Sequence, residues 1–130
     1  LATTGTIASR LYQDALTRRG LEALVPDPDQ QSLVTRAIMR VKAGKLDAET
    51  TELALAAGRW LVHCGARALV LGCTELPLIF PQDALSVPIV DPTRLLAEAA
   101  VAIARGQRPL PSKVSSGHAV STRKVSAEQA

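Results

Sequence analysis

Short apolar runs alternate along the chain with longer stretches in which apolar residues recur at helical spacing. The runs cover residues 1–3, 21–25, 67–71 and 87–90, and the helical pattern fills the stretches between them and residues 92–106. Short runs bounded by breakers indicate strands, and recurrence every three or four residues indicates helices. Strands that alternate with helices predict an α/β fold with a parallel sheet of about four strands.

Capping residues mark where the predicted helices begin and end. The first helix carries Ile7 and ends at Gly20, the second follows the Pro26-Asp27-Pro28-Asp29 turn and ends before Gly44, the third begins at Asp47 or Thr50 and ends at Gly65, and the last is capped by Asp91 and ends at Gly106. Asp and Thr at the start and Gly just past the end are typical of helix boundaries. The apolar face of the last helix consists of Leu95, Leu96, Ala99 and Ile103.

The chain changes character after Gly106. Residues 107–130 are rich in Ser, Lys and Pro and show no periodicity, which predicts a disordered basic tail. Residues 105–130 carry five Lys or Arg and one Glu, so the remainder has a net charge of −1 although the whole chain has +3. Residues 1–106 are therefore predicted to form one domain without the basic surface that nucleic-acid binding needs.

Composition narrows the class of protein further. No apolar run reaches membrane-spanning length and no signal peptide is recognisable, so we expect no membrane partner. The two cysteines do not form a disulfide framework, which favours a reducing cytoplasm. The sequence contains neither metal-ligand spacing nor a Gly-rich dinucleotide motif, so we expect no metal and no cofactor.

The most informative turn follows the apolar run at residues 67–71. Gly72 allows a sharp turn at the strand end, and Cys73, Thr74 and Glu75 then follow a strand that should be dry. Open α/β sheets bind ligands in the crevice at the carboxyl ends of their strands. A buried structural Cys is the alternative, but the polar neighbours favour a functional thiol at Cys73.

Two other sets of residues are candidates for substrate binding. Thr3, Thr4 and Thr6 lie in a small polar turn before a helix, where backbone N–H groups can approach an anion; an ordinary capped turn is the alternative. Lys42 lies near the end of the second helix, where a cation normally just favours the helix C-terminus.

His63 and Cys64 end the third predicted helix. A Cys–His pair would activate a thiol, but His63 should lie at the amino end of the strand and Cys73 at its carboxyl end, about 20 Å apart. We therefore interpret Cys64 as an inert core residue and expect Cys73 to be the reactive thiol.

Several motifs, taken in order, resemble the aspartate/glutamate racemase family. They are Leu1-Ala2-Thr3-Thr4-Gly5-Thr6-Ile7, Leu11-Tyr12, Val25-Pro26 with Gln30, Val41-Lys42-Ala43-Gly44, Gly72-Cys73-Thr74-Glu75-Leu76-Pro77 and Val90-Asp91-Pro92-Thr93. The resemblance covers residues 1–106. It implies a flavodoxin-like parallel sheet flanked by helices, which is one half of a two-domain aspartate racemase-like fold. Since the chain begins at Leu1 within a strand, we expect it to be the C-terminal half.

The resemblance also implies a mechanism. Racemisation removes a proton from one face of the α-carbon and returns one to the other, so two acid/base groups are needed. In this family a cysteine from each half flanks the substrate, and Cys73 corresponds to the second. Thr3, Thr4, Thr6, Lys42, Thr74 and Glu75 correspond to substrate-binding positions. The implied partners are an amino acid, aspartate or glutamate, a missing N-terminal half and, when complete, a second copy in a homodimer.

Two alternatives remain open on the sequence. The same fold serves related cysteine enzymes, including hydantoin racemases, maleate isomerases and arylmalonate decarboxylases. The second alternative, suggested by the truncated start, is a non-catalytic remnant that binds or dimerises. Because the first-half cysteine is missing, we expect the chain to be inactive alone.

Overall fold

The computed structural model describes residues 1–111 of the chain, in which four helices come first and two strands and a last helix follow. The helices are α1 (Thr4–Ala8), α2 (Leu11–Thr17), α3 (Pro28–Lys42), α4 (Ala48–His63) and α5 (Pro92–Ala104), with a 3₁₀ turn η1 (Leu76–Leu78). The strands are β1 (Leu69–Val70) and β2 (Ile89–Val90). Most of the predicted tail, residues 107–130, lies outside the described residues.

The sheet is parallel, as the sequence predicts. β1 pairs with β2 in the register Leu69↔Ile89 and Val70↔Val90. On the other edge of β1, the Leu1 amino group donates to the Val70 carbonyl and the Gly72 N–H donates to the Leu1 carbonyl, both over 2.7 Å. These two bonds form a parallel bridge opposite β1. The α/β class is therefore confirmed, with the segment at Leu1, β1 and β2 side by side.

The prediction of a strand at residues 21–25 is wrong for this structure. The segment carries no strand assignment, and residues 22–25 neither donate nor accept a backbone hydrogen bond within residues 1–111. Leu21, Leu24 and Val25 are exposed. An apolar run predicts burial, but a strand also needs a neighbouring strand to complete its hydrogen bonds, and neither strand of the described residues pairs with this segment.

The first predicted helix is divided into α1 and α2. The break lies at Arg10, which has a φ of 57° and caps α2 without a side-chain hydrogen bond. A non-Gly residue in the left-handed region interrupts an α-helix. Arg10 contacts Asp14 one turn later through an exposed ion pair of 3.1 Å, which contributes little stability.

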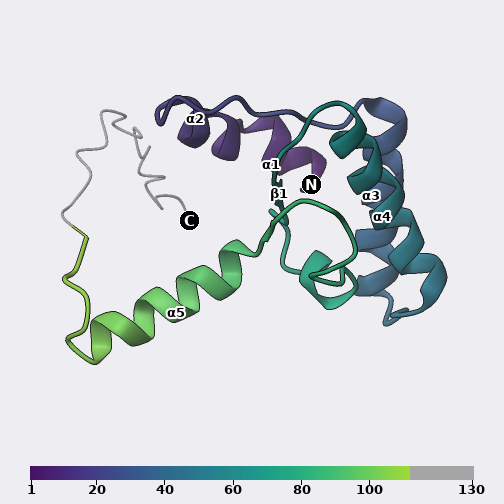
Figure 1. Cartoon of the computed structure of the whole chain (residues 1–130). Helices are drawn as coiled ribbons and strands as arrows, with labels where there is room; N and C mark the ends of the chain where they lie inside the picture. The colour runs from purple at the N-terminus through teal and green to yellow at the C-terminus, as the bar shows by residue number, and fades with distance from the viewer. Residues whose placement is uncertain (112–130) are drawn as a thin grey trace, which may run out of the picture.

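The core lies between the sheet and the α3–α4 pair, which packs side by side in Figure 1. It consists of Val34, Ala37, Ile38, Val41, Ala54, Ala57, Leu61, Leu69, Leu71, Leu76, Ile79 and Phe80. Gly58 lets this core close, since a Cβ there would lie 3.0 Å from the Phe80 ring and 3.3 Å from Leu69. Ala37, Ile38, Val41, Ala57 and Leu61, which recur at helical spacing along the two helices, lie in this core, whereas Cys64 at the end of α4 does not.

A polar cluster anchors the start of α4 to α3. The fully buried Thr50 hydroxyl donates to Asp47 over 2.7 Å and accepts from Arg40 Nε over 2.8 Å. Arg40 also pairs with Asp47 at 2.9 Å and with Glu49 at 2.7 Å. Hydrogen bonds from Thr50 and Arg40 lower the pKa of Asp47 to about 2.

We expect Thr50→Val to destabilise the chain by about 1–3 kcal/mol, because the substitution keeps the volume but leaves Arg40 Nε without its buried acceptor. Urea unfolding measures the change. Thr51→Val is the matched control, since the Thr51 hydroxyl makes no hydrogen bond within the described residues. Equal losses of stability in Thr50→Val and Thr51→Val would contradict this assignment.

The stability that the ionised Asp47 contributes should be lost as the pH falls from about 4 to 2.

α5 stands apart from the core. The helix begins as predicted, with Asp91 accepting hydrogen bonds from the N–H groups of Thr93 and Arg94. It then runs away from the other elements in Figure 1 and has no buried residue. Leu95 and Leu96 are 53% and 72% exposed.

Among residues 1–111, no helix combines the length and the apolar character that a membrane crossing requires.

Candidate functional site

Cys73 lies in the turn between β1 and η1, at the carboxyl edge of the sheet. The backbone leaves β1 through the fully buried Leu71 and through Gly72, and Cys73 is half-buried. The Gly72–Leu1 hydrogen bond aligns the start of α1 with the same edge. The structure therefore positions Cys73 and the Thr3–Thr6 turn where parallel α/β sheets form ligand sites.

Glu75 gathers three side chains around it. The Cys73 thiol donates to Glu75 Oε2 over 2.8 Å, and the Thr74 hydroxyl donates to the same oxygen over 3.0 Å. Lys42 Nζ, at the end of α3, lies 3.8 Å from Glu75 Oε1. Lys42 thus lies at a helix C-terminus, as the simpler interpretation requires, and also reaches the cysteine turn. Four of the residues predicted from the sequence form one cluster.

The environment keeps the proton on Cys73. Desolvation raises the pKa of the Cys73 thiol, and the hydrogen bond and negative charge of Glu75 raise it further, while Lys42 opposes them. The hydrogen bond from Cys73, then that from Thr74, lowers the pKa of Glu75, and Lys42 adds to this effect. The cluster at rest is therefore a neutral thiol held against an ionised carboxylate.

The Thr3–Thr6 turn is a helix cap in this structure. Thr3 Oγ1 accepts from the Thr6 N–H over 3.2 Å, and the two hydroxyl oxygens lie 2.9 Å apart. Thr4 is exposed. This is the local arrangement that an ordinary capped turn predicts. Within residues 1–111 no hydrogen bond joins these threonines to the Cys73 cluster, so their role in substrate binding stays a prediction.

Tyr12 belongs to the site, although sequence reasoning did not include it among the site residues. A Cβ on Gly72 would lie 2.6 Å from Tyr12 Cε2, so only glycine lets the ring pack against the backbone that precedes Cys73. Desolvation and the negative charge of the Cys73 thiolate raise the pKa of Tyr12. The available signal was the rarity of tyrosine: the only one in the chain follows the predicted Thr3–Thr6 turn.

The interpretation of Cys64 as a core residue is wrong. Cys64 is the C-cap of α4 and is exposed, as is His63 before it. The sequence interpretation continued the buried face of α4 to Cys64. The side chain at the end of this helix is not held against the core. Exposure therefore favours Cys64 as the faster thiol toward a bulky reagent.

We expect Glu75→Gln to increase the alkylation rate of Cys73 severalfold at pH 8, because losing the carboxylate charge lowers the thiol pKa and enlarges the thiolate fraction. Mass spectrometry after iodoacetamide treatment measures both cysteines, and the rate at Cys64 serves as the internal reference. Glu98→Gln, on α5, is the matched control. An unchanged or slower rate at Cys73 would contradict the electrostatic role of Glu75.

Within residues 1–111, no group of three His, Cys, Asp or Glu side chains has the geometry to hold a metal ion. At Cys73 the structure brings together a thiol and a carboxylate from the cysteine turn and an ammonium group from the end of α3.

Comparison with known proteins gives three findings. The family model described as Asp/Glu/Hydantoin racemase matches residues 1–100. The chain is 36% identical over 103 residues to the uncharacterized protein of the pnlA 3′ region of Pectobacterium carotovorum subsp. carotovorum, covering 78% of this chain and 68% of that protein. It also superposes with a TM-score of 0.73 and 28% identity on the crystal structure of a proposed Asp/Glu racemase from Yersinia pestis.

The alignment with the Yersinia pestis structure covers 81% of this chain and 46% of the solved one. The chain therefore spans less than half the length of that relative.

Proposed function

Because the chain belongs to the Asp/Glu/hydantoin racemase family, we propose that it supplies one of two thiols for cofactor-independent racemisation of an acidic amino acid. Cys73 is the acid/base group in this proposal. The contact between Cys73 and Glu75 over 2.8 Å is the observation that supports it most directly. A two-sided reaction needs one group that holds a proton while its counterpart removes one.

The resting protonation state gives Cys73 a definite role. Its raised pKa keeps the thiol protonated near neutral pH, so it acts first as the acid. It donates a proton to one face of the α-carbanion, and the resulting thiolate is the base for the reverse reaction. Glu75 positions the S–H through its hydrogen bond and is itself kept ionised by its neighbours.

The developing negative charge of the carbanion needs fixed donors. The Thr74 hydroxyl and the Lys42 ammonium lie around Glu75, and Lys42 is about half exposed, which leaves it open to a substrate carboxylate. The start of α1, with Thr3, Thr4 and Thr6, is the proposed binding place for the second carboxylate. These assignments favour a dicarboxylic amino acid.

The second thiol is proposed to come from another α/β half. The two cysteines of this chain cannot act as a pair across a substrate, because they lie at opposite ends of β1. Cys64 ends α4 before the amino end of the strand, whereas Cys73 follows its carboxyl end. A complete enzyme of this kind would comprise both halves, and a reducing cytoplasm would keep its thiols free.

The test is an assay of these residues joined to a first α/β half that carries its own cysteine. Loss of optical rotation is followed for aspartate, glutamate and 5-substituted hydantoins, with α-proton exchange in D₂O measured in parallel, and isomerisation of the achiral maleate to fumarate is followed separately. Racemisation of an acidic amino acid is the expected result. Turnover of hydantoins or maleate alone would assign a related cysteine reaction. If none of the substrates reacted or exchanged its α-proton, the result would count against catalysis.

A further inference from the structure

Gly72 is the point where the starts of α1 and α2 both meet the cysteine turn. A Cβ on Gly72 would lie 3.2 Å from the Ala2 methyl carbon and 2.6 Å from Tyr12 Cε2. Ala2 leads directly into the Thr3–Thr6 turn, and Tyr12 is the second residue of α2. Cys73 is the residue that follows Gly72. One glycine therefore connects the proposed carboxylate-binding turn with the thiol.

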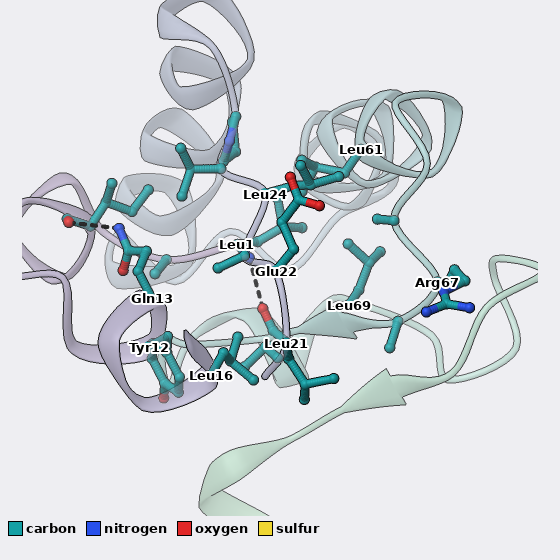
Figure 2. Close-up of a pocket in the computed structure, with 18 of the residues that line it drawn as sticks. Leu1, Tyr12, Gln13, Leu16, Leu21, Glu22, Leu24, Leu61, Arg67 and Leu69 are labelled. Atoms are coloured by element: carbon teal, nitrogen blue, oxygen red, sulfur yellow. Dashed lines mark hydrogen bonds between the residues drawn. The ribbon is translucent and has the colours of Figure 1, made fainter. Parts of the chain in front are cut away.

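The break between α1 and α2 brings Tyr12 back to this point. In one unbroken helix the backbone of Tyr12 would lie about 12 Å along the axis from Thr4, at about 1.5 Å per residue. The left-handed Arg10 ends that course, and its N–H donates to the Ile7 carbonyl over 3.0 Å. Gln13 Nε2 donates to the same carbonyl over 3.0 Å (Figure 2). These bonds fix the direction of α2, so that the Tyr12 ring reaches the glycine beside which α1 begins.

The contact is made by the edge of the ring. Tyr12 Cδ2 and Cε2 lie 3.2 and 2.6 Å from the Cβ position of Gly72. Gly72 is not among the glycines with a positive φ, so its backbone would accept an alanine that the ring excludes. Desolvation raises the pKa of the Tyr12 phenol, which is therefore neutral. The ring brings bulk to the turn but no charge, and desolvation is the largest cause of the raised pKa of Cys73.

We propose that Tyr12 is a positioning residue that holds the Thr3–Thr6 turn at a fixed distance from the Cys73 turn, through the packing of its ring on Gly72. Within residues 1–111 no hydrogen bond joins the threonine side chains to the Cys73 cluster, so packing has to set this distance. A displacement of about 1 Å can cost about 10²-fold in rate. That consequence for catalysis rests on the proposed function, whereas the effect on the Cys73 thiol does not.

The first test measures the rate of Cys73 alkylation against pH in the full chain. Tyr12→Ala is expected to move the midpoint of the profile to lower pH and to raise the rate at pH 8 about threefold, as a shift of about half a pH unit would. Water then reaches the turn, and the thiol is held less firmly against Glu75. Tyr12→Phe keeps the ring edge and should retain the parental midpoint, as should Leu11→Ala, the matched control at an exposed position of α2. Greater access alone would raise the rate at every pH and leave the midpoint unchanged, which would overturn the proposal.

Gly72→Ala tests the same contact from the other side and leaves the ring in place. In the parent and in Tyr12→Phe the added methyl group overlaps the ring, so the turn has to shift and the Cys73 midpoint should move. In Tyr12→Ala the methyl group has room, so Gly72→Ala should cause little further change. Such non-additivity is expected only of residues in contact. Additive shifts of the midpoint would overturn the assignment.

The second test uses the joined form described above. Tyr12→Ala is expected to lower kcat/KM by about 10²-fold, with KM raised as well as kcat lowered, and Tyr12→Phe should retain both parental values. If the joined parent racemised nothing while the Cys73 profiles moved as expected, the proposed function would fail and the positioning contact would stand. If Tyr12→Ala and the parent had the same Cys73 profile, the positioning role would fail even in an active enzyme.

Discussion

Cys73→Ser is expected to lower racemisation by about 10²–10⁴-fold in both directions, the usual contribution of a positioned acid/base group. The chain is assayed joined to a first half, as above, with both enantiomers as substrate. A serine hydroxyl fits the same space and still reaches Glu75. It does not readily become an anion near neutral pH, so it cannot replace the thiol as the base for one enantiomer.

Measuring α-proton exchange and inversion separately makes this prediction specific to the two-thiol role. Exchange of the α-proton should survive for the enantiomer that the other thiol deprotonates, whereas inversion should be lost for both. Cys64→Ser is the matched control, since Cys64 is exposed at the end of α4 and should leave both rates unchanged. Racemisation by Cys73→Ser at the parental rate would exclude Cys73 as an acid/base group.

The sequence predicted those features that depend on short-range patterns. The caps at Asp27, Asp47 and Asp91 all accept hydrogen bonds from the first turn of their helices. Breakers and apolar runs placed β1 and β2 correctly, although each is only two residues long. Cys73, Thr74 and Glu75 are adjacent in the chain, so their clustering needed only the turn that Gly72 permits.

The features that depend on distant partners were missed or wrong. Residues 21–25 have the composition of a strand, but pairing is decided by what lies beside them. Tyr12 joins the site only because its ring fits against Gly72, sixty residues further along the chain. The contact between Lys42 and Glu75 likewise depends on α3 packing beside η1, which helical periodicity alone does not establish.

The second large effect concerns α5, which has no buried residue although its apolar face carries Leu95 and Leu96. We expect the chain to self-associate through this face, and Leu95→Gln with Leu96→Gln to weaken the association constant by about 10²-fold or more. Each buried leucine contributes about 1.5–3 kcal/mol, and about 1.4 kcal/mol is a tenfold change. Leu and Gln have similar helix propensities, so the helix should remain intact. Light scattering and sedimentation equilibrium measure the change.

The matched control is Arg94→Gln with Glu98→Gln, which breaks an exposed ion pair of 2.8 Å on the same helix but keeps the leucines. This control should leave association almost unchanged, since exposed i,i+4 pairs contribute only about 0.3–0.5 kcal/mol. Adding a first α/β half should compete with self-association, because we propose that α5 packs across onto that half in the complete enzyme. A monomeric parent chain whose α5 amides are as protected from exchange as those of β1 would contradict this. The helix would then dock on its own half, and its leucines would need no partner.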